Sequence, residues 1–171
     1  MPGKISDAYS NLAAINLTMS GVDTLTFDKF DFPVSVMEEV GLLISRIEYV
    51  FLNLSQLNST GDYAVAAITV SKNTASLIDI EDPTIIDSAR VLRFDIGTAA
   101  SGFFYDQPII RDLSTLPGGG LLVAPNPLYV AENSSGAGAA LGVAVRMYYT
   151  LKELKPDEYW QLVESRRIVT D

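Results

Sequence analysis

Residues 139–151, AALGVAVRMYYTL, carry the clearest strand signal in this chain. Apolar side chains such as Val143, Val145 and Met147 occupy every second position, while small or polar residues such as Arg146 fall between them. In an extended strand, alternate side chains point to opposite faces of the sheet. The stretch therefore predicts a long strand with one buried face.

The same period of two recurs in shorter runs along the chain, separated by polar, glycine-rich or proline-containing connections. An apolar phase slip predicts a bulge near Asp28 and Lys29, and an acidic connection is expected over residues 72–87. About eight short strands without helices between them are typical of a sandwich or jelly roll. The expected strands lie near residues 15–19, 25–27, 41–54, 63–71, 92–96, 107–112, 121–130 and 139–151, and the aromatics expected on core faces are Phe27, Phe30, Phe32, Phe51 and Phe94.

One helix is predicted after the last strand, over residues 155–168. Pro156 suits a first helical turn, acidic Asp157 and Glu158 follow it, and basic Arg166 and Arg167 come at the far end, which matches the helix dipole. The predicted fold is an all-β, eight-stranded, jelly-roll-type antiparallel β-sandwich with a short C-terminal helix. We expect a single domain over residues 1–171, with an N-terminal arm at 1–10 and the sandwich at 11–154.

The composition excludes several function classes. The 171 residues contain no histidine and no cysteine, so Ser-His-Asp triads, Cys-His pairs, His-ligated metals and cupin-type centres are ruled out. The net charge of −9 opposes direct binding to nucleic acid or anionic lipid. No enzyme activity and no cofactor are expected. Only 19% of residues are charged, against 48% hydrophobic, which predicts apolar surface available for partners.

The start of the sequence shows neither a secretory signal nor a transit peptide, which predicts a protein made in a cytoplasm. Its longest apolar stretch, residues 137–145, is far shorter than the roughly 20 residues that span a bilayer, so no membrane span is expected.

Two motifs invite a chemical interpretation. Pro117 is followed by Gly118, Gly119 and Gly120, but no Lys-Ser/Thr pair follows as in a phosphate-binding loop, so a flexible loop at one end of the sandwich is expected. Asp79 and Glu81 would project to one side of an extended segment, as a glycosidase pair or a calcium site requires. A solvated acidic loop is the commoner outcome, and no metal site is assigned.

Aromatic residues outside the expected core are candidates for contacts between subunits, because aromatics are enriched at interfaces. The candidate interface residues are Phe103, Phe104, Gly118, Gly119, Gly120, Tyr159 and Trp160.

Almost the whole chain resembles the small single-jelly-roll capsid proteins of tailless icosahedral viruses, and the resemblance is strongest from Arg111 to Arg167. The resemblance lies in RDLSTLPGGG at residues 111–120, PNPLY at 125–129, the strand ending VRMYY at 145–149 and the helix start DEYW at 157–160. It implies a non-enzymatic coat protein of a virion that assembles with copies of itself, with a second coat protein as an optional companion. The chain departs from nucleic-acid-packaging coat proteins because Lys4 is its only basic residue before Lys29.

Two other functions stay open at this stage. A β-sandwich module that binds carbohydrate or protein, as on a viral fibre or spike, predicts a row of exposed aromatics on one sheet face. A carboxylate-dependent glycosidase predicts that Asp79 and Glu81 face a cleft, with one raised pKa.

Overall fold

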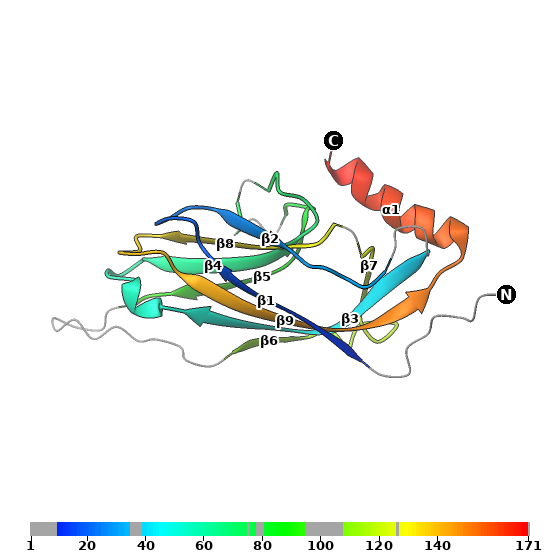
Figure 1. The fold of residues 1–171 in the computed structure, drawn as a ribbon, viewed down its shortest axis with the longest axis horizontal. Helices are drawn as coiled ribbons and strands as arrows, with labels where there is room; N and C mark the ends of the chain where they lie inside the picture. Colours follow the sequence, from blue (N-terminus) through cyan, green and yellow to red (C-terminus); the bar gives the residue numbers. More distant parts are fainter. Residues whose placement is uncertain are drawn as a thin grey trace.

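The computed structural model describes residues 10–34, 39–74, 76–77, 81–94, 108–125 and 127–170, and the side chains of residues 165–170 are outside that description. Two antiparallel sheets face each other, and one helix follows the last strand (Figure 1). The elements are β1 (Asn11–Thr18), β2 (Thr26–Lys29), β3 (Val40–Leu52), the short 3-10 helix η2 (Leu54–Gln56), β4 (Tyr63–Thr69), β5 (Ile85–Leu92), β6 (Ile109–Asp112), β7 (Leu121–Val123), β8 (Tyr129–Ser135), β9 (Gly142–Glu153) and α1 (Pro156–Thr170).

The strand order is that of a jelly roll. Sheet A has the order β1-β9-β3-β6, with β7 also paired to β3, and sheet B has the order β2-β8-β4-β5. The pairings are nested from the ends of the chain inward: β1 with β9, β2 with β8, β3 with β6 and β7, and β4 with β5. Such nesting arises when one long antiparallel hairpin is rolled into two sheets. The fold class expected from the sequence is confirmed.

The described residues contain nine strands rather than eight, because the one strand expected over residues 121–130 is replaced by two, β7 and β8. The prolines of this stretch were expected to mark an edge strand or a bent strand. β7 belongs to sheet A and β8 to sheet B, so the proline-containing stretch between them crosses from one sheet to the other.

Three further expectations are corrected. β5 begins at Ile85, inside the segment expected to be a connection. β2 stays in register with β8 through Asp28 and Lys29, whereas the register shifts in β3 between Ile44 and Arg46 and in β4 between Ile68 and Thr69. Phe94, expected in the core, is 56% exposed because β5 ends two residues before it.

The core lies between the sheets. Its buried side chains include Ile44 and Tyr49 of β3, Ile68 of β4, Val130 of β8 and Met147 of β9. A second buried cluster around Leu57 and Leu141 closes one end of the sandwich. The predicted faces of β9 are confirmed, since Val143, Val145 and Met147 are fully buried. Phe30 is buried as expected, and Phe32 and Phe51 pack part-buried against the core. Phe27, also expected in the core, instead lies opposite Ala131 on the outward side of sheet B, because the alternation of β2 turns it away from the core.

Candidate interaction surface

Four of the eight exposed large apolar side chains among the described residues lie on the outward side of sheet A. Leu12 of β1 is 56% exposed and Ile110 of β6 is 48% exposed, at the two margins of the sheet. Val50 and Leu52 of β3 are exposed on the same side, because side chains alternate along a strand and Phe51 between them faces the core. We call this the outer face of sheet A, and we define it by the outward residues Leu12, Ala14, Asn16, Arg46, Glu48, Val50, Leu52, Ile110, Asp112, Ala144, Arg146 and Tyr148.

An ionic network occupies the middle of this face. Glu48 forms an ion pair with Arg46, with 2.6 Å between a guanidinium nitrogen and Oε1. A guanidinium nitrogen of Arg146, on the neighbouring strand, lies 4.0 Å from Oε2 of Glu48. The guanidinium of Arg46 also lies over the ring of Tyr148, 5.6 Å from its centre. Asp112 is paired opposite Arg46 in the register of β3 and β6, and hydrogen bonds from Ser114 lower the pKa of its carboxyl. The face thus combines charges of both signs with apolar margins.

The outward side of sheet B is covered by its own chain. Leu77 is buried against Val65, Ala67 and Ala131, which are the outward residues of β4 and β8. In the same connection, the hydroxyls of Thr74 and Thr84 are 2.6 Å apart and buried. Among the described residues, no comparable buried cluster forms on the outer face of sheet A. The two sheets therefore differ in how much apolar surface they leave to solvent.

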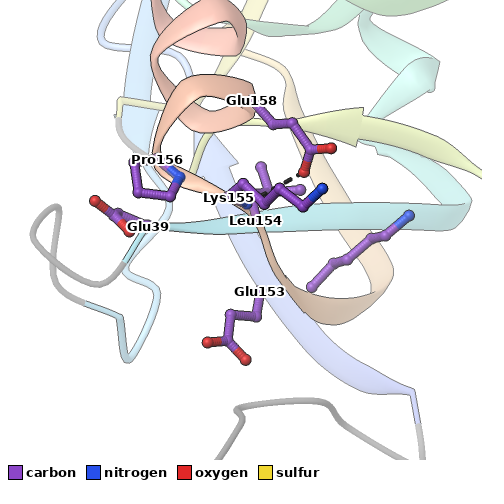
Figure 2. Close-up of a pocket in the computed structure, with 7 residues that line it drawn as sticks. Glu39, Glu153, Leu154, Lys155, Pro156 and Glu158 are labelled. Carbon is purple, nitrogen blue, oxygen red and sulfur yellow. Dashed lines mark hydrogen bonds between the residues drawn. The ribbon is translucent and has the colours of Figure 1, made fainter.

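The two adjacent aromatics of α1 have opposite environments. Tyr159 is 3% exposed and Trp160 is 58% exposed, with their rings edge to face at 5.9 Å. The helix start is ordered by the side chain of Glu158, which accepts a 3.1 Å hydrogen bond from the backbone N–H of Lys155 (Figure 2). Of this pair, Trp160 is the one accessible to a partner, whereas Tyr159 packs within its own chain.

The shallow hollow at the junction of β9 and α1 has mixed charge. Figure 2 shows Glu39, Glu153 and Glu158 around it, and Lys152 and Lys155 also line it. Leu154 and Pro156 add apolar lining, but three carboxylates and two ammonium groups are spread around the depression without converging on one point, as the polar groups of a small-molecule site do. We assign no ligand to it.

The three glycines of the loop before β7 have different roles. Gly118 and Gly119 adopt positive φ angles of 90° and 80°, and a Cβ at either position would meet no atom within 4 Å. At Gly120 a Cβ would lie 2.5 Å from the carbonyl oxygen of Ile44. Gly120 is thus required by close packing against β3, while Gly118 and Gly119 form an open tip beside exposed Leu116. Phe103 and Phe104 lie outside the described residues.

A carboxylate orders the loops at the opposite end of the sandwich. Asp23 accepts hydrogen bonds from the hydroxyl of Ser134 at 2.7 Å and from the N–H groups of Gly136 and Ala137 at 3.0 and 3.2 Å. Partial desolvation would raise the pKa of Asp23, but these three hydrogen bonds outweigh it and lower the pKa below its usual value. The loop before β2 is thereby linked to the connection between β8 and β9.

One part-buried and one fully buried carboxyl group were missed in the sequence. Asp87 of β5 accepts a 2.9 Å hydrogen bond from the hydroxyl of Tyr49 and lies 3.6 Å from Arg111, which joins the two sheets near the edge formed by β5 and β6. Burial raises the pKa of Asp87 despite these partners. Glu132 of β8 is fully buried, neither carboxyl oxygen has a hydrogen-bond partner among the described residues, and burial raises its pKa to about 8.

Glu132 is turned away from the surface. It lies on the core face of β8, in phase with Leu128 and Val130, and it does not line the hollow at the junction of β9 and α1 or the groove beside β1. That phase was visible in the sequence, where Glu132 continues an alternating apolar run. Of the acidic pair weighed for hydrolysis, Glu81 is exposed and Asp79 lies outside the described residues.

The described residues also show no metal or membrane feature. They contain no group of three or more acidic side chains placed to hold a cation. None of the described helical segments has both the length and the hydropathy needed to cross a bilayer. Exposed aromatics do not form a row on either sheet face: in the part of the chain that the structure describes, the large ones are Phe94, beyond the end of β5, and Trp160 on α1.

Comparison with known proteins finds similarity to solved structures. No family model matches the chain, and no curated protein matches its sequence. Among solved structures, it is similar to a chain from "The Structure of Tomato Aspermy Virus by X-Ray Crystallography", with a TM-score of 0.47 and 12% sequence identity, over 91% of this chain and 84% of that chain.

Proposed function

We propose that this chain is a structural subunit that self-associates into a shell, as a viral coat protein does, and that it is not an enzyme. The observation that carries this proposal is the outer face of sheet A, where Leu12 and Ile110 stay exposed around an ionic network while sheet B is covered by its own chain. Apolar patches with embedded arginine and aromatic side chains are typical of protein interfaces.

The jelly-roll topology limits the functions to be compared. This architecture serves as viral capsid domains, lectin domains and cupins. A cupin centre needs histidine ligands, and the chain has none. A lectin-like site that stacks sugars on aromatics finds no exposed aromatic row on the described sheet faces. Because fold alone does not fix function, the exposed face and the composition carry the argument beyond topology.

The proposal also covers the partners and the location. The partners are copies of the chain itself, with a second coat protein as the alternative occupant of the same face, and the place of action is the virion. The net charge of −9 argues that another component neutralises the genome. Trp160 and the tip formed by Gly118 and Gly119 are proposed as additional contacts between subunits, together with Phe103 and Phe104.

The test is the mass of the purified chain across concentration and salt, by size-exclusion chromatography with light scattering and by negative-stain microscopy. We expect oligomers, rings or shells. Ile110→Asp should weaken association at least about 10-fold, because it introduces a charge that must be desolvated at the interface. Val22→Asp is the matched control, because Val22 is also 48% exposed but lies in a loop away from this face. A wild-type chain that stays monomeric under every condition would overturn the proposal.

A further inference from the structure

The four sheet edges of the sandwich are protected very unequally. β2 and β6 are only four residues long and carry Asp28 and Lys29, or Arg111 and Asp112. The longer β5 carries Asp87 and Arg90. Short length and charged residues are the usual devices that keep an edge strand from pairing with another chain. Three of the four edges in the described part of the chain have at least one of these devices.

β1 has none of them. Its eight residues, NLAAINLT, include no charge and no proline, and it pairs with β9 without a break in register from Asn11 to Thr18. Such a long, regular and uncharged edge is a template for a further strand.

The open edge of β1 is also accessible. A surface groove is lined by six consecutive residues of this strand, from Asn11 to Asn16, and on its other side by Asp28, Lys29, Phe30, Asp31 and Pro33. A groove that follows consecutive residues of an edge strand exposes backbone to a partner. An added strand would lie along β1 and continue sheet A.

We propose that β1 pairs antiparallel with β1 of a second copy, so that sheet A runs continuously through a two-fold axis. This inference rests on the proposed self-association and names the contact that drives it. A second copy is the occupant that fits best, because an uncharged strand meets no like-charge repulsion from its own duplicate. The new contact lies at the margin of the outer face that holds Leu12.

The alternation of side chains restricts the register of this pair. In an antiparallel pair, directly opposite residues share one face, so an inward residue must meet an inward residue of the other copy. The two-fold axis must therefore place one residue of β1 directly opposite the same residue of the other copy. An axis that placed two neighbouring residues opposite each other would pair an inward residue with an outward one. With Ile15 on the axis, Ile15 meets its own copy and Ala13 meets Leu17, which are apolar pairs on the inward side. With Ala14 on the axis, Asn11 would meet the buried Leu17. We assign the axis to Ile15.

This register is testable because the chain has no cysteine of its own. With Ile15 on the axis, Ala14 of one copy lies opposite Asn16 of the other, with Cβ atoms about 5 Å apart, while identical residues lie on a diagonal at about 7–8 Å. We would co-express Ala14→Cys and Asn16→Cys chains that differ in tag size, oxidise them, and compare disulfide formation with that of each variant alone. The expected result is at least about 10-fold faster formation of the mixed dimer.

The matched control is the pair Ser88→Cys and Arg90→Cys, two positions apart on the outward side of β5, an edge strand of sheet B that lies outside the outer face of sheet A. It should not show this preference. If light scattering shows assemblies but the mixed Ala14 and Asn16 dimer forms no faster than the control, edge pairing is overturned while self-association stands. Monomers throughout would overturn both. Fast crosslinking of Ala14→Cys alone would overturn the register centred on Ile15.

Discussion

Replacing Glu132 by methionine should stabilise the chain, and the gain should grow with pH. The carboxyl lies on the core face of β8, opposite Ala66 of β4, and both its oxygens lack hydrogen-bond partners among the described residues. Burial raises its pKa from 4.5 to about 8. Methionine has a similar volume and flexibility but cannot ionise.

The size of the effect follows from proton linkage. Between pH 4.5 and about 8 the folded chain keeps a proton on Glu132 that the unfolded chain releases. The folded state then binds more protons, so its stability is full below the unfolded pKa and falls as the pH rises toward the folded pKa. Each pH unit in this window costs about 1.4 kcal/mol, which gives about 5 kcal/mol in total and about 3 kcal/mol at neutral pH.

The assay is urea unfolding at several pH values from about 5 to about 9, below the concentration at which the chain associates. Wild type should lose stability across this range relative to Glu132→Met. Like Glu132→Met, Glu132→Gln should not lose stability with rising pH at this site. Its free energy of unfolding should increase less than that of Glu132→Met, because the glutamine amide remains a buried polar group without a partner. Glu153→Gln, at the exposed end of β9, serves as the control and should follow wild type. The reasoning fails if wild type and Glu132→Met give parallel pH profiles, or if methionine destabilises the fold at every pH.

Three further predictions concern single contacts. Gly120→Ala should lower the free energy of unfolding by about 1–3 kcal/mol, because its Cβ would clash with the Ile44 carbonyl. Gly118→Ala is the control and should lower it by about 1 kcal/mol, because only the positive φ is unfavourable there. Equal urea midpoints for the two variants would contradict this prediction. Asp23→Asn should cost about 1 kcal/mol near neutral pH, and because the pKa of Asp23 is lowered in the fold, thermal melts should show this difference vanishing as the pH falls through that pKa. Trp160→Ala should leave the unfolding midpoint unchanged while reducing association in light scattering, and a loss of folded stability would show that the exposed ring has a structural role instead.

The sequence was sufficient for elements whose burial follows a local period. β9 and β1 have one buried and one exposed face, so their alternation of apolar and polar residues survives in the sequence. α1 was recognisable because Pro156 and the charges at its two ends are local signals. These elements, with the spacing of turns, were enough to predict a jelly-roll-type sandwich.

The errors occur where tertiary pairing overrides local pattern. Residues 121–130 were expected to form one strand, because nothing local to Pro125 indicates that the chain passes between two sheets there. β5 begins among residues that alternate weakly, since one of its faces carries Asp87, whose partners Tyr49 and Arg111 are distant in sequence. Phe94 appeared to continue the apolar phase of β5, but the strand ends before it.

The candidate interface was predicted only in part. Adjacent aromatics do not reveal which one faces solvent, so Tyr159 and Trp160 could be separated only by the packing of α1 against the rest of the chain. The outer face of sheet A was not named at all, because its members come from four strands and each contributes only one or two exposed apolar residues. Glu132 was also overlooked, although it stands in phase with its buried neighbours.

The nested pairing of the strands has a consequence for how the chain acquires its structure. In sheet A, β9 lies between β1 and β3, so Asn11 finds its partner only in Tyr149. Contacts this distant in sequence form slowly, because a long loop must close before any pairing is gained. During synthesis, the edges of β1 and β3 that later pair with β9 therefore stay unpaired until β9 has been made. We expect truncated chains that stop before Gly142 to form no partial sandwich and to aggregate through those edges, which makes the completed C-terminal strand the step that commits the chain to its native state.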